Sequence, residues 1–208
     1  MTELLPLFVA LAGRRVVLVG GGRVAAAKLR QLLATGADVR VVAPAVDEEI
    51  ERAGVAIERR PFQPDDLDGA WFVVAAATPA VNGEVARAAG TRRIFVNAVD
   101  DPANATAFLG GVVRREGVTI AISTSGDAPA LAGLLREAFD ALLPRDLAMW
   151  MAEARRQRAV WRREGVPMEK RRPLLLEALN RLYRHREPSS EHSTLTIPWL
   201  GSPEDSWL

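Results

Sequence analysis

Three consecutive glycines stand where a hydrophobic segment gives way to a helical one. The β-branched run 16–19 precedes Gly20-Gly21-Gly22 directly, and an alanine- and leucine-rich stretch begins at Ala25. Gly-x-Gly-x-x-Ala between a strand and a helix is typical of a dinucleotide-binding turn. Gly20 would permit the tight turn, Gly22 would let backbone amides approach a pyrophosphate, and the helix start would attract the phosphates. The pattern predicts a nicotinamide dinucleotide site, with a merely tight turn as the alternative.

The next strand lacks the acidic residue that often binds the adenosine ribose of NAD. Val42 is followed by Ala43-Pro44-Ala45, about twenty residues past the glycines. Ribose contacts would then come from the backbone or from residues such as Arg23. Because an arginine at this place also suits a phosphate, the residues predict a dinucleotide and leave NAD and NADP both open.

Two further polar residues follow strand-like segments. Asp100 comes just after the segment 94–96, and Thr78 comes after the segment 72–75. Ligands of open α/β sheets gather at the carboxyl ends of the strands, where a carboxylate can act as general base. The alternatives are a solvated turn carboxylate for Asp100 and a helix cap for Thr78.

These residues are set in an alternation of short strands and helices. Strands are predicted at 16–19, 39–42, 55–59, 72–75 and 94–96, with helices at 25–34 and 81–89. Strands separated by such helices indicate crossover connections and a parallel sheet covered on both faces. The fold class is therefore a Rossmann-like, doubly wound α/β domain over residues 1–106.

The second half has a different pattern. Strand-like segments 108–113 and 118–123 flank a polar turn at 114–117, and helices are predicted at 129–143, 144–161 and 167–186. We expect a strand pair with a helix over 107–143, a helical domain over 144–186, and a disordered or loosely packed tail over 187–208. A partner-binding peptide is the alternative for the tail.

Composition narrows the chemistry further. The chain of 208 residues has a net charge of +1, no cysteine, and only His185 and His192 as histidines. This excludes disulfides, thiolate sites and a histidine-built metal site or Ser-His-Asp triad on the main domain. Nothing favours nucleic acid or membrane partners, and the apolar run 4–11 lacks a preceding basic residue, so we expect a cytoplasmic protein without a signal peptide.

Several motifs in the same order along the chain resemble the precorrin-2 dehydrogenase and sirohydrochlorin ferrochelatase family, the N-terminal module of siroheme synthase. The resemblance covers about Leu5 to the helices after Pro144. The motifs are Pro6-Leu7-Phe8, the glycine stretch ending at Ala25 with Lys28 following, Ala75-Ala76-Ala77-Thr78, Val96-Asn97-Ala98-Val99-Asp100, and Ile122-Ser123-Thr124 through Leu135-Arg136. It implies a homodimer with a Rossmann-like domain, a dimerisation region and a helical C-terminal domain.

The activity that the resemblance implies is NAD-dependent oxidation of precorrin-2 to sirohydrochlorin. Some members then insert ferrous iron, and whether this chain takes a ferrous or a cobaltous ion as a substrate stays open. The family's catalytic carboxylate corresponds to Asp100. By the family's pattern the cofactor also contacts Arg23, Val24, Pro44 and Ala45, in addition to Gly20, Gly22 and Thr78.

A substrate with many carboxylates needs cationic or amide donors. Ser123 and Thr124 lead into a helix whose first amides could bind a carboxylate, although Asp127-Ala128 departs from the family's pattern. Arginine candidates for the substrate are several: Arg114, Arg115, Arg136, Arg155-Arg156 and Lys170-Arg171-Arg172, of which Arg136 lies in a matched motif.

The helix predicted at 129–143, which contains Arg136, also has an apolar face. Leu131, Leu134, Leu135, Ala138 and Leu142 follow helical spacing and predict core or dimer contacts. Trp150 and Trp161 in the next helix are likewise predicted as core or dimer-contact residues, with stacking on a macrocycle as the alternative.

Two other functions fit parts of the pattern. A nucleotide-sensing regulatory domain also uses a glycine-rich turn, but typically keeps an acid after the second strand. A reductase of another small substrate is the second alternative.

Overall fold

The computed structural model describes residues 3–184, which form two compact units. The first contains residues 3–112 and 121–137, and the second contains residues 113–120 and 138–184. His185, His192 and the predicted tail lie outside the described residues. Within residues 3–184, no helix is both long and apolar enough to cross a membrane.

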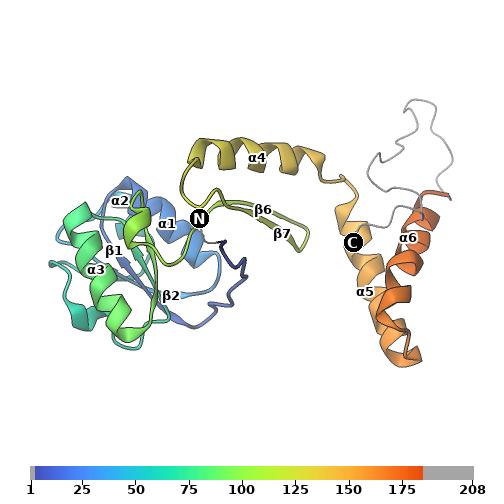
Figure 1. The fold of residues 1–208 in the computed structure, drawn as a ribbon, viewed down its shortest axis with the longest axis horizontal. Helices are drawn as coiled ribbons and strands as arrows, with labels where there is room; N and C mark the ends of the chain where they lie inside the picture. Colours follow the sequence, from blue (N-terminus) through green and yellow to red (C-terminus); the bar gives the residue numbers. More distant parts are fainter. Residues whose placement is uncertain (1–2, 185–208) are drawn as a thin grey trace. The chain divides into compact units, whose positions relative to one another are not determined.

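A five-stranded sheet is the centre of the first unit (Figure 1). Its strands are β1 Arg15–Val19, β2 Asp38–Val42, β3 Ala56–Glu58, β4 Phe72–Ala75 and β5 Phe95–Ala98. They are all parallel, in the order β3-β2-β1-β4-β5. The chain thus extends outward from β1 first to one side and then to the other, and the predicted doubly wound α/β fold is confirmed.

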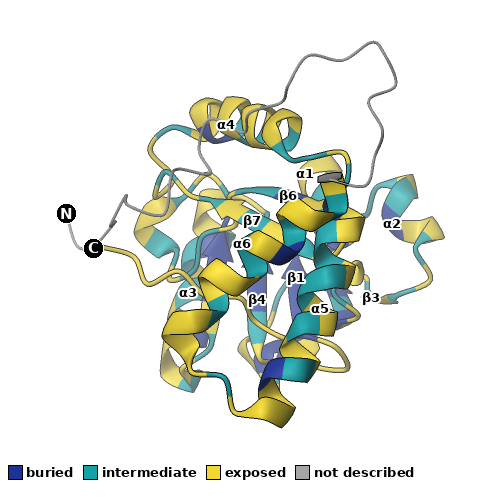
Figure 2. Cartoon of the chain, turned by 90° about the vertical axis from the view of Figure 1, so that its right-hand side faces the viewer, coloured by how far each residue is buried: buried dark blue, intermediate teal, exposed yellow. Residues whose placement is uncertain are grey.

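Alternate residues of the strands bury side chains on opposite faces of the sheet. Val16 and Leu18 pack with helix α1, Arg23–Leu33, in one cluster, whereas Val17 and Val19 pack with helix α3, Pro79–Arg92, in the other. Figure 2 shows the resulting dark blue strands. Because both faces are covered, the central strands are hydrophobic throughout instead of alternating with polar residues.

Helix α1 shows how the sequence specifies this packing. Its buried residues are Ala25, Ala26, Leu29 and Leu32, which recur at helical spacing, while Arg30 and Gln31 are exposed. Small alanines in the first turn let the helix approach the sheet closely. The helix begins two residues earlier than the sequence predicts.

Three short elements of the first unit are not predicted by the sequence. Helix α2 covers Glu48–Arg52, and the 3-10 helix η1 covers Pro64–Leu67. A further 3-10 turn, η2, covers Pro102–Asn104 after β5. These elements are too short to show a hydrophobic period, so the chain's local pattern does not reveal them.

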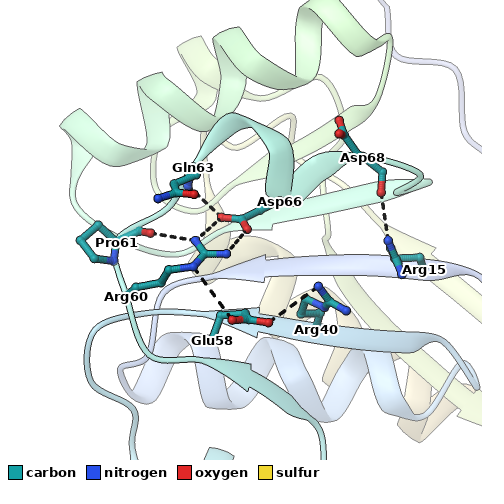
Figure 3. A network of polar contacts seen from close by, with 8 residues as sticks. All are labelled: Arg15, Arg40, Glu58, Arg60, Pro61, Gln63, Asp66 and Asp68. Carbon is teal, nitrogen blue, oxygen red and sulfur yellow. Dashed lines mark hydrogen bonds and ion pairs between the residues drawn. The ribbon is translucent and has the colours of Figure 1, made fainter.

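Polar contacts at Asp66 fasten η1 to the sheet edge (Figure 3). Its carboxylate accepts hydrogen bonds from Arg60 at 2.9 and 2.5 Å and from the Gln63 backbone N–H at 2.8 Å. Burial raises the pKa of Asp66, but these hydrogen bonds and the Arg60 charge outweigh burial, so the pKa lies below its ordinary value.

The later elements follow the predicted order. Strands β6 Gly111–Arg115 and β7 Val118–Ile122 form a hairpin, followed by helices α4 Pro129–Leu142, α5 Leu147–Glu164 and α6 Met168–Arg184. Glu116 and Gly117 connect the hairpin with positive φ at both residues, as a two-residue turn between twisted strands requires.

Helices α5 and α6 pack on each other within the second unit. Trp150 Nε1 donates to the Tyr183 hydroxyl at 2.6 Å, and Trp161 is buried. Trp161 therefore has the predicted core position, while Trp150 joins the two helices.

Candidate active site

The glycine turn lies at the carboxyl end of β1 and is constrained on two sides. Gly20 has φ +126°, and a Cβ added there would lie 2.2 Å from the Ala76 carbonyl oxygen. A Cβ on Gly21 would lie 1.9 Å from the Ala45 carbonyl oxygen. Neither position can hold a side chain without moving backbone, so these two glycines are required by the connections after β4 and β2.

Gly22, in contrast, faces open space. No atom lies within 4 Å of a Cβ built on it, and it is the N-cap of α1 without a side-chain cap. No acidic residue lies in the first turn of α1, and Val24 is 49 % exposed. The first amides of the helix therefore point their partial positive charge toward space that a ligand can enter.

The connection from β2 to α2 lies against the glycine turn. Pro44 and Ala45 are exposed, and the Asp47 N–H donates to the Gly21 carbonyl at 2.6 Å. The Asp47 side chain accepts from the Glu49 N–H at 3.0 Å and so caps α2. The residues predicted for the adenosine side thus lie beside the turn, and the nearby acid is engaged as a helix cap.

Thr78 lies at the N-cap of α3 but makes no side-chain cap hydrogen bond. The preceding Ala77 N–H is satisfied by the buried Asn82 side chain at 3.1 Å. Of the two predicted roles of Thr78, capping by its hydroxyl is therefore not realised. The hydroxyl lies close to the carboxyl end of β4.

Asp100 follows β5 and lines a cavity of about 310 Å³ in the first unit. Its φ is +55°, a left-handed conformation that aspartate and asparagine tolerate better than most residues. The cavity volume is at the lower end of the ~300–1,000 Å³ of ligand pockets. Its walls come from α1, the β5 end, the segment 108–111, the loop 123–126 and the start of α4.

Asn97, in β5, also lines the cavity and carries an unsatisfied oxygen. The residue is 6 % exposed, and its Nδ2 donates to the Ala107 carbonyl at 3.0 Å. That bond fixes the orientation of the amide, so Oδ1 is the atom left buried without a hydrogen-bond partner. A buried acceptor without a donor costs about 1–3 kcal/mol, which is tolerated at sites that bind ligands.

Lys28 reaches the same cavity from the second turn of α1. Burial lowers the pKa of this half-buried ammonium, and the negative charge of Asp100 partly opposes the shift. Lys28 makes no ion pair or hydrogen bond with any described residue, and it is the one cation among the residues described as lining the cavity.

Of the three predicted substrate residues, two line the cavity and one does not. Ser123 and Thr124 line the cavity, where their hydroxyl oxygens accept from the Ser125 and Ala128 N–H groups at 3.1 and 3.3 Å. Arg136 does not line it and pairs with Glu137 at 2.9 Å. Hydroxyl protons thus remain available at the cavity, whereas the arginine is engaged outside it.

Sequence reasoning missed three features of this site. Gly21 was not singled out, although it is as restricted as Gly20, and neither Lys28 nor Asn97 was assigned a role. Both polar residues fall in motifs that the sequence shows. Asn97 lies three residues before Asp100 in the chain, whereas only the tertiary fold brings Lys28 of α1 to the same cavity. Within residues 3–184, no group of three or more His, Cys, Asp or Glu side chains is arranged to hold a metal ion.

Comparisons with known proteins agree with the sequence motifs. Residues 7–111 match a family model described as putative NAD(P)-binding. A siroheme synthase of Photorhabdus laumondii is 39% identical over 183 residues, which are 86% of this chain and 39% of that protein. Siroheme synthase 3 of Aeromonas hydrophila is 44% identical over 150 residues, 70% of this chain and 32% of that protein.

One solved structure is similar to this chain over nearly the whole length of the solved chain. SirC, a precorrin-2 dehydrogenase, has a TM-score of 0.67 and 26% sequence identity, covering 87% of this chain and 92% of that one. The chain spans about two fifths or less of the two siroheme synthases it matches. The predicted resemblance and the predicted nicotinamide cofactor class are confirmed by these matches.

Proposed function

The chain belongs to the putative NAD(P)-binding family, and on that premise we propose that it oxidises precorrin-2 to sirohydrochlorin with NAD as the acceptor. Asp100 is the observation that carries the proposal. It places a carboxylate at the carboxyl end of β5, in a cavity whose wall includes the helix that begins at the glycine turn. Dinucleotide site and carboxylate thus share one edge of the sheet.

The dinucleotide is held by backbone more than by side chains. The amides of Arg23 and Val24 bind the pyrophosphate over Gly22, where no Cβ intervenes. Pro44 and Ala45 contact the adenosine side, and the Thr78 hydroxyl donates to the nicotinamide side. With Gly20 as the turn residue, these are the predicted cofactor positions.

The reaction converts precorrin-2 and NAD⁺ into sirohydrochlorin, NADH and one proton. NAD, when bound, supplies the hydride acceptor. Asp100 accepts the proton from a ring N–H of the macrocycle, because a carboxylate within hydrogen-bond reach of that proton is an effective general base. Ser123 and Thr124 donate their hydroxyl protons to the substrate's carboxylates.

The cavity takes only part of the tetrapyrrole, because its volume is about 310 Å³. The remainder of the macrocycle extends beyond the described cavity. Arg136, 40 % exposed at its side chain, would bind an outer carboxylate by exchanging Glu137 for it.

Homodimerisation is part of the proposal. Helix α4 exposes Leu131, Leu134, Leu135, Phe139 and Leu142, which recur at helical spacing. A contiguous apolar stripe of this kind marks a protein interface. We assign residues 107–143 to dimerisation and residues 144–186 to the helical domain, in a cytoplasmic enzyme.

Asp100→Asn tests the activity with little disturbance of the backbone. Asparagine tolerates the left-handed φ of +55° that alanine would strain, and it replaces the carboxylate with a neutral amide of the same shape. We expect NADH formation from precorrin-2, measured by absorbance, to fall about 10²–10⁴-fold while NAD affinity stays within twofold.

Two results would contradict the proposal in different ways. Unchanged turnover in Asp100→Asn would remove Asp100 from the mechanism. A wild-type protein that binds NAD but does not oxidise precorrin-2 would favour the nucleotide-sensing alternative.

A further inference from the structure

The substrate proposed above carries many carboxylates, yet the cavity beside Asp100 has a single cationic residue in its described lining. That residue is Lys28, and the other charged groups of the lining are Asp100 and Asp101. The arginines that the sequence offers for this role do not line the cavity. Without Lys28, the described walls would repel an anionic substrate.

The ammonium of Lys28 is half-buried and forms no ion pair with any described carboxylate, so it can bind an anion. It comes from α1, whose start is fixed by the glycine turn, and it is half-buried. No carboxylate oxygen of a described residue lies within 4.0 Å of the Lys28 Nζ, so the charge of Asp100 acts on the ammonium only at longer range. A half-buried charge without a partner is unfavourable, and an entering carboxylate would relieve it.

Other groups of the cavity complement this charge. The hydroxyls of Ser123 and Thr124 lie in the same lining, and the Oδ1 of Asn97 is an acceptor without a donor. The cavity thus offers cationic and hydroxyl donors for a carboxylate, and acceptors for a ring N–H.

We propose that Lys28 binds a carboxylate substituent of the substrate at the α1 wall of the cavity and thereby orients the macrocycle toward Asp100. The inference rests on the proposed function. It assigns Lys28 as a determinant of specificity for carboxylated tetrapyrroles, with no part in the chemical step.

Lys28→Met tests the assignment, because methionine keeps an unbranched stem and removes the charge. The matched control is Arg30→Met, which removes one positive charge from an exposed position of the same helix. The probe is sirohydrochlorin, whose binding is followed by its fluorescence at low and at moderate salt. NAD affinity and thermal unfolding are measured on each variant.

We expect Lys28→Met to raise the Kd for sirohydrochlorin about tenfold or more and to weaken its salt dependence. NAD affinity should stay unchanged, Arg30→Met should bind as wild type does, and Lys28→Arg should recover most of the affinity. For turnover of precorrin-2, Lys28→Met should raise KM more than it lowers kcat.

Three outcomes would overturn the assignment. Sirohydrochlorin binding by Lys28→Met equal to wild type would exclude the contact, while wild-type turnover left the proposed function standing. Unchanged binding with a shifted pH profile of kcat would make Lys28 a charge acting on Asp100 instead. A folded wild type that neither binds nor oxidises the tetrapyrroles would overturn both the proposed function and this inference. If Lys28→Met does not fold, Lys28→Arg and Lys28→Gln give the same comparison.

Discussion

Adjacent glycines of the turn after β1 should respond in opposite ways to the same substitution. In Gly21→Ala, the new Cβ would lie 1.9 Å from the Ala45 carbonyl oxygen and 2.9 Å from its carbon, both backbone atoms. In Gly22→Ala, the new Cβ meets nothing within 4 Å. Gly21→Ala should therefore disturb the fold, whereas Gly22→Ala should disturb only a ligand that binds over the start of α1.

The magnitudes follow from these contacts. To restore an ordinary separation, Gly21→Ala must shift the β2–α2 connection by more than an ångström, for which we expect about 3 kcal/mol of destabilisation. In a protein of this size that corresponds to a Tm lower by roughly 6–12 °C. Gly22→Ala loses a little at the N-cap and gains through lower entropy of the unfolded chain, so its Tm should stay within about 3 °C of wild type.

For NAD binding, Gly22→Ala is the substitution with the large expected effect. The methyl group of Gly22→Ala would stand where the pyrophosphate approaches the helix amides, and we expect roughly 10–100-fold weaker NAD binding from the loss of one such charged hydrogen bond. Differential scanning fluorimetry without NAD and calorimetric titration with NAD measure the two effects. Equal Tm values for Gly21→Ala and wild type, or wild-type NAD affinity in Gly22→Ala, would refute this account of the turn.

The remaining predictions concern stability and assembly. Asp66→Asn should lower the Tm by a few degrees at pH 7, because it removes the carboxylate that Arg60 contacts. Since the folded pKa of Asp66 is depressed, the stabilisation is full above the ordinary value of 3.8 and is lost as the pH falls through the folded pKa. If the Tm curves of wild type and variant stay parallel through acid, the Arg60 contact is not stabilising. Asn82→Ala should cost about 1–3 kcal/mol in urea unfolding, since it leaves the Ala77 N–H without its partner, and a neutral effect would show that water replaces the side chain. Leu134→Glu should convert a dimer to a monomer in sedimentation, with NAD affinity retained; a dimer that persists would exclude the α4 stripe from the interface.

Local pattern determined much of this fold. The strands and helices of the first unit lie where the hydrophobic periods indicate, because burial on both sheet faces requires continuous apolar strands and amphipathic helices. Helix ends moved by a few residues, as α1 does at Arg23 and α5 at Leu147. The five-residue helix α2 and the turn η1 escaped prediction, since so few residues show no period.

By itself, the sequence determined that a glycine turn follows the first strand and that a carboxylate follows the fifth. Both statements depend on neighbours in the chain, which is why spacing and residue type suffice. Tertiary structure alone decided that Gly21 cannot carry a side chain, that Arg136 lies outside the cavity, and that Lys28 faces Asp100 from 72 positions away in the sequence. Each of these facts depends on segments that lie far apart in the chain, and no local preference of either segment encodes their contact.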